Sequence, residues 1–425
     1  MKIPSMMGAR SILAVVGQHA QDAIALRSTR SSLLRAPHVK LDQLRRLDDR
    51  LAAHLDGLEV AGECGAQLVA AALENPGQGE IFTATVRAIE DRNAVALQKA
   101  LALVQVLSDS RSGLISAFGW VSTSSLRGIT RALLEAPEAF YRQIGLAACA
   151  MHGVDPGAAA VAALKNEDAA LRVQALRLNA SLGRVDFLAD CLSAMADKDA
   201  HCALEAARAA VLLGNRREAV SALCNTALVP GRWRAGALAL ALKLLTPTDS
   251  HAVLRALAQK PADVRLLVRG TGVAGDPHYV PWLIQQMHDP KLARLAGESF
   301  SLMTGLDLAR QGFEQKLFEI AETGPSDDPS DDGVATEEDY GLPWPDAEKI
   351  GSWWQTNASR FAAGTRYFMG EPPTPAHCLS ILKTGYQRQR IAAAEWRCLL
   401  APGTPLFNTA APAWRQQRWL AKMGA

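Results

Sequence analysis

A short segment recurs six times in the middle of this chain, and this repeat limits the fold more than any other feature. Most copies end at a glycine, which suits the left-handed residue that closes a helix, and a shorter helical segment precedes each copy. The copies start at Tyr141, Leu171, Cys202, Trp233, Val264 and Ala293, 29 to 31 residues apart, after segments 124–135, 157–165, 188–195, 218–227, 250–259 and 280–288. A helix–turn–helix unit cannot bury its apolar face alone, so the copies must stack. The sequence therefore predicts an all-α solenoid of helical pairs.

The residues before the repeats are helical as well. Leucines recur at intervals of three and four along one predicted helix, at Leu41, Leu44, Leu47, Leu51, Leu55 and Leu58. This spacing places them on one face. Further helical patterns at 65–74, 80–90 and 92–108 continue the array toward the repeats.

The pattern changes after the last repeat. Seven acids and no Lys or Arg lie between Ser326 and Asp339, and six of the nine tryptophans follow this strip. So acidic a segment cannot bury enough apolar surface to fold alone. We expect the Trp-rich module to cap the last repeat and cover Leu302, Met303 and Leu306. The predicted organisation is an N-terminal helical region over 1–123, repeats over 124–308, a connecting helix over 309–325, an acidic disordered linker over 326–340 and a Trp-rich C-terminal helical module over 341–425.

Composition bounds the compartment. The seven cysteines are odd in number and free of CxxC spacing, which argues against a disulfide framework or a zinc site. The apolar run near Ser11 is too short for a signal peptide, and no stretch approaches the roughly 20 apolar residues of a membrane-spanning helix. We therefore expect a cytoplasmic protein with no membrane partner.

Two motif matches are weak. Gly270, Gly272 and Gly275 satisfy GxGxxG, but they fall inside the second helix of a repeat and not in a βαβ unit, so packing by small residues is the better interpretation. The span 328–339 follows a calcium-loop template imperfectly, with Pro329 interrupting it. No HExxH, GxSxG or Walker motif occurs. The sequence predicts no catalytic residue, cofactor or metal, and hence no enzyme.

An arginine near the start of most copies has two interpretations. It can pair with acids of the preceding turn or the neighbouring unit and lock the repeats together, for instance Asp168 with Arg172. It can also present a basic stripe to phosphates. We favour the structural ladder, because the positions sit at helix starts with an acid nearby. The series consists of Arg142, Arg172, Arg234, Arg265 and Arg294.

The repeat pattern xRxxAxxAxxxxGxxD resembles the HEAT-like repeats of phycobilisome lyases and many bacterial scaffolds. The chain also resembles, over nearly its whole length, an uncharacterised proteobacterial family. The stretches that carry this resemblance are His19–Ala23, Arg35–His38, Leu47–Arg50, His54–Leu58, Ala61–Glu63, Leu342–Pro345, Gly364–Tyr367 and Gln387–Arg390. Genes of that family often lie beside type VI secretion clusters that encode spike and PAAR-like proteins. The resemblance implies an accessory role and supplies no active site.

The hypothesis is a non-catalytic protein-binding scaffold: an adaptor, chaperone or immunity-like partner of a type VI effector or spike/PAAR-like protein. The alternative is a helical-repeat DNA-binding protein or a DNA glycosylase-like enzyme, although nucleic acid is the less favoured partner. Two adjacent tryptophans cannot both face one side of a helix, so one of them is a candidate partner contact. The candidate partner surface comprises Trp353, Trp354, Arg366, Tyr367, Arg388 and Arg390.

Overall fold

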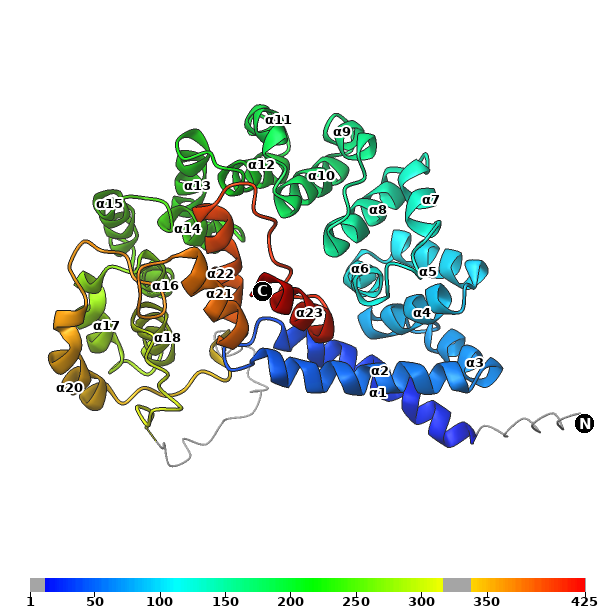
Figure 1. Cartoon of the computed structure of the whole chain (residues 1–425), viewed down its shortest axis with the longest axis horizontal. Helices are drawn as coiled ribbons and strands as arrows, with labels where there is room; N and C mark the ends of the chain where they lie inside the picture. The colour runs from blue at the N-terminus through cyan, green and yellow to red at the C-terminus, as the bar shows by residue number, and fades with distance from the viewer. Residues whose placement is uncertain (1–11, 316–337, 425) are drawn as a thin grey trace, which may run out of the picture. The chain divides into compact units, whose positions relative to one another are not determined.

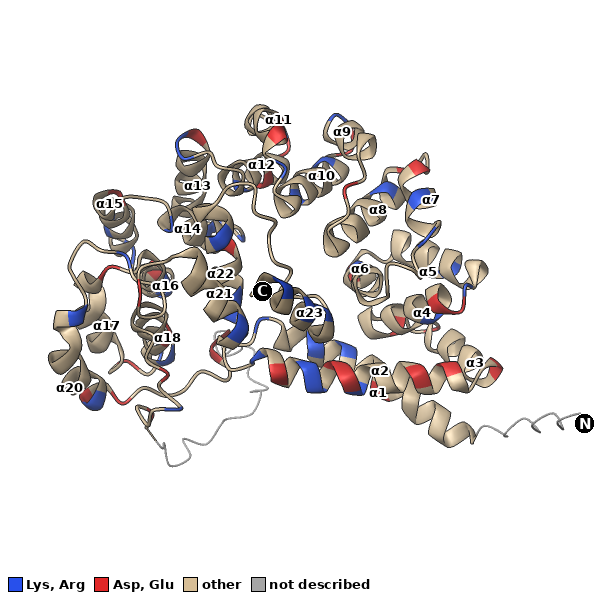
Figure 2. Cartoon of the chain, viewed as in Figure 1, with Lys and Arg blue, Asp and Glu red and all other residues tan. Residues whose placement is uncertain are grey.

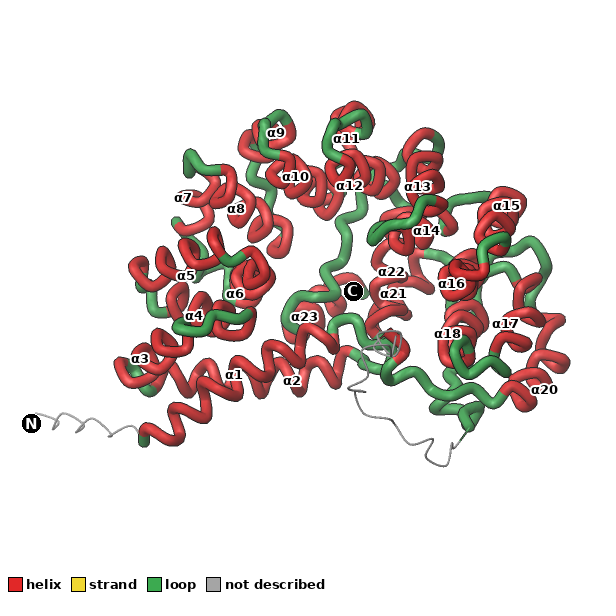
Figure 3. The backbone as a smooth tube through the Cα atoms, turned by 180° about the vertical axis from the view of Figure 1, so that it is seen from behind, coloured by secondary structure: helices red, strands yellow, loops and turns green. Residues whose placement is uncertain are grey.

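The computed structural model describes residues 12–315 and 338–424, and residues 1–11, 316–337 and 425 lie outside the description. The described residues form 22 α-helices and five short 3-10 helices joined by loops, and they contain no β-strand (Figure 3). The prediction of an all-α protein is confirmed.

These residues fall into two compact units. Unit 1 comprises Met1–Arg35, Val39–Leu178 and Asn408–Ala425, and unit 2 comprises Ala36–His38 and Asn179–Phe407. The division falls inside helix α10. Each unit therefore contains residues from distant parts of the chain. The last residues of the chain, from Asn408 on, belong to unit 1 together with the first helices (Figure 1).

Unit 1 contains the first nine helices, most of α10 and the last helix. Their bounds are α1 Leu13–Leu33, α2 Leu41–Val60, α3 Glu63–Ala72, α4 Gln78–Glu90, α5 Ala94–Val106, α6 Arg111–Trp120, α7 Ile129–Glu135, α8 Ala139–His152, α9 Ala158–Leu164, α10 Ala169–Leu182 and α23 Ala413–Met423. The expected leucine stripe forms the buried face of α2, where all six leucines are at most 9% exposed. The sequence patterns did not predict α1 or α6.

Unit 2 contains the remaining helices. They are α11 Leu188–Ala194, α12 Ala200–Leu212, α13 Glu218–Leu228, α14 Arg234–Leu242, α15 Pro247–Ala258, α16 Val264–Ala274, α17 Val280–Gln286, α18 Ala293–Thr304, α20 Ala347–Asn357, α21 Pro375–Thr384 and α22 Gln387–Leu400. The helical character expected of the module over 341–425 is present in this unit, where α21 and α22 form a helical pair. Helix α20 was not predicted.

Each expected helical pair is present as two helices, from α7 and α8 to α17 and α18. The glycines after the second helices have positive φ, for example +66° at Gly153, +70° at Gly183 and +68° at Gly275. Such angles are easy only for glycine. The repeated glycine therefore ends the second helix, as its position in the sequence predicts.

Second helices pack side by side within unit 2. Helix α16 contacts α14 on one side and α18 on the other, and it contacts α15 of its own pair. The GxGxxG residues serve this packing: a Cβ at Gly270 would lie 2.7 Å from a methyl of Leu254, and one at Gly272 would lie 2.7 Å from Cα of Ser299. The glycines let α16 approach its neighbours closely and do not form a nucleotide loop.

Each unit has its own apolar core. In unit 1 buried side chains of α1 to α8 form one cluster, against which Trp414 of α23 packs. In unit 2 a cluster joins α16, α17, α18 and α20 to Phe361 and Tyr367. None of the seven cysteines, all of which lie in the described residues, forms a disulfide, and five of them are buried.

Two parts of the predicted connection need correction. Residues 309–315 form turns instead of the start of a connecting helix, with Gly312 at a φ of +75°. At the end of the expected disordered linker, residues 338–340 are ordered, and Asp339 is only 5% exposed because Arg265 pairs with it. The rest of 316–337, including most of the calcium-loop template, lies outside the described residues.

Candidate protein-binding surface

Two arginines of the repeat series link one helical pair to the next. Arg234, at the start of α14, forms a two-pronged ion pair with Asp263, with N–O distances of 2.6 and 2.8 Å. This hydrogen bonding lowers the pKa of Asp263. Arg265, at the start of α16, donates to the main-chain oxygen of Lys291 at 2.8 Å and to both carboxylate oxygens of Asp339. Since Asp263 and Lys291 lie just ahead of the next second helix, these contacts fit the structural ladder.

The other arginines of the series differ from one another. Arg172 donates to the main-chain oxygens of residues 166 and 167, both at 2.8 Å. The guanidinium of Arg294 lies over the ring of Trp344, 4.9 Å from its centroid. Nε of Arg142 is buried and has no hydrogen-bond partner among the described residues. The series is therefore not one uniform ladder.

The adjacent tryptophans of α20 are both half-buried. Trp353 meets Phe300 edge-on at 5.8 Å between ring centroids, and Trp354 lies 5.4 Å from Phe361. Trp353 also lines an open groove of about 610 Å³ between α20 and residues 311–313. Both indoles pack on the core of unit 2 and keep an exposed part, so the predicted partner contact here stays a prediction.

Arg366 and Tyr367 hold a loop against helix ends. The guanidinium of Arg366 donates to the main-chain oxygens of Lys243, Leu245 and Ala274, which lie at or just after the ends of α14 and α16. Burial lowers the pKa of Arg366. Tyr367 is 8% exposed, and its hydroxyl accepts from the amide of Ala362 at 2.9 Å. Tyr367 is therefore buried away from a partner, whereas Arg366 is partly exposed but uses its guanidinium to bind helix ends of its own unit.

Arg390 and Arg388 on α22 have different surroundings. Arg390 is fully buried, donates to the main-chain oxygen of Leu382 at 2.8 Å and has a pKa lowered to about 10 by burial. The prediction that Arg390 lies on a partner surface is therefore wrong for this structure, because the side chain is buried. Arg388 is partly exposed and forms an ion pair with Glu298 of α18, with N–O distances of 2.8 and 3.0 Å. Burial raises the pKa of Glu298.

The loop at 366–370, which turns at Met369 and Gly370, is bound through its main chain. The amide of Tyr367 donates to Gly275 O at 2.8 Å, and those of Met369 and Gly370 donate to the carbonyls of residues 302 and 303 at 2.6 and 2.9 Å. A Cβ at Gly275 would lie 2.2 Å from Tyr367 O. The glycine that ends α16 therefore also lets the main chain of Tyr367 come close. Sequence patterns could not reveal these contacts, because main-chain partners carry no side-chain signature.

Comparisons with models of protein families, with curated proteins and with solved structures found no match. Lys and Arg are interspersed with Asp and Glu along the helices of each unit (Figure 2). In the described part of the chain, no three His, Cys, Asp or Glu side chains are grouped to hold a metal ion, and no helix is long and apolar enough to cross a membrane.

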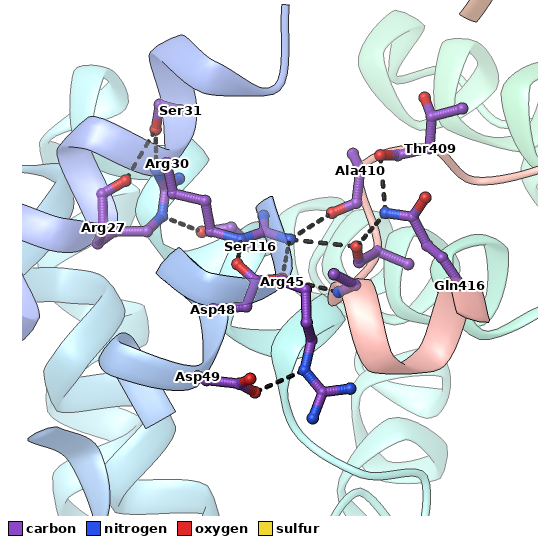
Figure 4. Close-up of polar contacts among 12 residues, drawn as sticks. Arg27, Arg30, Ser31, Arg45, Asp48, Asp49, Ser116, Thr409, Ala410 and Gln416 are labelled. Atoms are coloured by element: carbon purple, nitrogen blue, oxygen red, sulfur yellow. Dashed lines mark hydrogen bonds and ion pairs between the residues drawn. The ribbon is translucent and has the colours of Figure 1, made fainter. Parts of the chain in front are cut away.

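A second cluster, in unit 1, holds the C-terminal segment (Figure 4). Arg30 of α1 pairs with Asp48 of α2 and also donates to the main-chain oxygens of Ala410 and Ala411, at 3.1 and 3.2 Å. Asp48 accepts from the amide of Ala413, the first residue of α23, at 2.7 Å. One signal in the sequence could have revealed this cluster. Asp48 lies within the leucine stripe of α2, and a carboxylate on that buried face needs a partner.

Arg415 fastens α23 to a third helix. Its guanidinium donates to the main-chain oxygens of Gly119, Trp120 and Val121, at 2.8 to 3.0 Å, where α6 ends. Trp120 and Trp414 meet edge-on with ring centroids 4.9 Å apart. Burial lowers the pKa of Arg415 to about 10, so the side chain stays charged at neutral pH. A cation at a helix C-terminus complements the unsatisfied carbonyls and the helix dipole.

Proposed function

We propose that this chain is a non-catalytic protein-binding scaffold, an α-solenoid of HEAT-like helical pairs whose Trp-rich C-terminal module covers the last pair. The row formed by α14, α16 and α18 supports the solenoid, since each second helix contacts the next one. The contacts of Met369 and Gly370 with residues 302 and 303 support the capping role.

One observation carries the binding function. The ends of α16 and α18 hold the loop at 366–370, which turns at Met369 and Gly370, through main-chain hydrogen bonds, and Arg366 joins α14 to the same loop. Main-chain hydrogen bonds are the basis of many peptide-recognition modes, because they bind the backbone and leave specificity to the neighbouring side chains. A helical array whose helix ends bind the backbone of its own loop has the chemistry needed to bind a segment of another protein.

The partner is proposed from the resemblance. It points to a cytoplasmic accessory role beside a type VI effector or a spike/PAAR-like protein, in which the scaffold would act as an adaptor, chaperone or immunity-like protein. The partly exposed Trp353, Trp354 and Arg388 are the expected contacts.

Co-expression of the tagged full chain with each protein encoded beside its gene tests this function. We expect one of these proteins to co-elute in a complex of defined stoichiometry by size-exclusion chromatography with light scattering. Trp354→Ala should weaken that complex, whereas Trp233→Ala, which removes another partly exposed indole of the same unit away from the candidate surface, serves as a matched control. A folded chain that forms a complex with none of them would contradict the proposal.

A further inference from the structure

We propose that α16, α18 and α22 form a binding site for a short acidic segment followed by an apolar and aromatic stretch, and that residues 338–345 of this chain fill the site in cis. The inference rests on the proposed protein-binding function and specifies the chemistry of the partner. The cis segment reads Glu-Asp-Tyr-Gly-Leu-Pro-Trp-Pro.

Three guanidinium groups surround the acidic end of this segment. Arg265 holds both carboxylate oxygens of Asp339 at 2.8 Å, and Arg269 pairs with Glu338. Arg388 donates to the main-chain oxygen of Glu338. Helices α16 and α22 therefore direct three guanidinium groups at two consecutive acidic residues, and charge-assisted hydrogen bonds of this kind are stronger than neutral ones.

The charges of the site require an acidic occupant. Arg265, Arg269 and Arg388 bring three positive charges, and Glu298, which pairs with Arg388, supplies one negative charge of the site itself. Glu338 and Asp339 supply the other two. Removing the segment would leave two cations without a carboxylate partner, so the site favours a ligand with two adjacent carboxylates.

The remainder of the segment fits by shape. A Cβ at Gly341 would lie 1.9 Å from Nδ1 of His38, so only glycine fits at this position. Leu342 is 8% exposed, and Trp344 lies under the guanidinium of Arg294 at 4.9 Å. A buried leucine and a ring stacked under an arginine are the anchors from which peptide-binding sites gain most of their affinity.

The cis segment is suited to exchange with a similar segment of a partner. The side chain of Glu338 is 59% exposed and Tyr340 is 70% exposed, so the acidic end lies at the surface. The exposed pair between Arg269 and Glu338 holds the segment weakly and is screened by salt. The carboxylate of Asp339 is buried against Arg265, so a partner must supply both carboxylates to exchange with the segment. A partner with the same pattern of two acids, glycine, leucine and tryptophan would compete for the same arginines.

A peptide-binding experiment with the full chain tests the site. The probe is a fluorescein-labelled peptide with the sequence of residues 338–345, followed by fluorescence anisotropy at low salt. In the parent chain the cis segment competes, so we expect weak binding. The double variant Glu338→Gln, Asp339→Asn weakens the cis segment and should bind the probe at least tenfold more tightly. Adding Arg269→Gln should remove most of this gain, whereas Arg310→Gln, an exposed arginine elsewhere in unit 2, should not.

Two further measurements keep the test decisive. A probe with Gln and Asn in place of its two acids should not bind the double variant; equal binding of both probes would overturn the site. If the double variant does not fold, hydrogen exchange of the parent chain is measured with and without a saturating concentration of the peptide. The peptide should displace the cis segment and speed exchange at the Leu342 amide, which donates to Asp339 O. Unchanged exchange would overturn the proposal.

The outcomes separate this site from the proposed function. A neighbouring gene product that is captured equally by the parent chain and by the Arg269→Gln variant, with no peptide binding, would sustain the scaffold and overturn this site. Peptide binding without any captured gene product would sustain the site and count against the type VI partner. Binding of duplex DNA instead of the peptide by the double variant would overturn the acidic-segment site and favour a nucleic-acid partner.

Discussion

Arg30 and Asp48 form a buried ion pair that also fixes the start of the last helix. Nε of Arg30 lies 2.6 Å from Oδ1 of Asp48, and the two side chains are 7% and 0% exposed. The second carboxylate oxygen accepts from the amide of Ala413. One carboxylate therefore joins α1, α2 and α23. Its loss would leave the buried guanidinium of Arg30 without a counter-charge and the amide of Ala413 without its acceptor.

We expect Asp48→Ala to lower the free energy of unfolding by about 3 to 5 kcal/mol, the usual cost of removing one partner of a buried ion pair. The matched control is Asp49→Ala, which breaks the exposed pair between Arg45 and Asp49 on the same helix. An exposed pair contributes roughly 0 to 1 kcal/mol. Urea unfolding followed by circular dichroism measures the free energy of unfolding of both variants. An equal decrease in the two variants would show that Asp48 does not hold the C-terminal segment.

Arg366 joins the ends of two helices to the loop at 366–370, and its removal should loosen that loop. Arg366→Ala leaves three main-chain carbonyls without their donor. A buried polar group left unsatisfied costs about 1 to 3 kcal/mol. We therefore expect the free energy of unfolding to fall by about 2 to 4 kcal/mol. Hydrogen exchange at the amides of residues 367–370 should become faster. Arg360→Ala, at an exposed arginine close by in the sequence, should change neither quantity. Unchanged protection in Arg366→Ala would mean that the main chain alone holds this stretch.

Sequence patterns predicted the local structure well. The glycine after each second helix and the leucine stripe of α2 are signals within one or two turns of the chain, and periodicity detects such signals. The predicted pairs from α7 and α8 to α17 and α18 follow from them. The connecting helix expected over 309–325 does not begin at residue 309, because the chain turns at Gly312, and residues 316–325 lie outside the described residues.

Periodicity could not predict the contacts that hold the C-terminal segment or those on which the binding proposals rest. Arg30 reaches main-chain oxygens 380 and 381 residues further along the chain, and Arg366 contacts carbonyls, which every residue has. Residues 338–340 looked disordered because their composition is acidic. They are ordered because Arg265 and Arg269, from a distant repeat, neutralise Glu338 and Asp339.

Gly272 tests the packing role of the GxGxxG residues. Its Cβ would lie 2.7 Å from both Cα and Cβ of Ser299 on α18, so Gly272→Ala should push the two helices apart and cost about 1 to 3 kcal/mol by overpacking. Gly351 of α20 has open space around it. Gly351→Ala should therefore be neutral or stabilise by about 0.5 to 1 kcal/mol. Thermal unfolding compares the two, and a harmless Gly272→Ala would contradict the close approach of α16 and α18.

His152, the last residue of α8, makes stability depend on pH. Nε2 of its ring donates to Phe118 O at 2.8 Å. Burial lowers the pKa of His152 below 6.5, and the charge of Arg415 acts in the same direction. The unfolded chain therefore takes up this proton at a higher pH than the folded chain. The contribution of a neutral His152 is complete above about pH 6.5 and is lost as the pH falls below this value toward the folded pKa.

We expect the urea midpoint of the parent chain to fall between pH 7.5 and pH 5.5, and the fall to be smaller in His152→Gln. The glutamine amide can still donate to Phe118 O but cannot take up a proton, so only the pH-dependent part of the stability changes. His38 and His54, whose pKa values burial also lowers, keep the remaining slope. His288→Gln, at an exposed histidine, should keep the full slope of the parent. If His152→Gln keeps that full slope as well, protonation of His152 is not coupled to the packing of α8 against α6, and the titrating group must be sought among the other buried histidines.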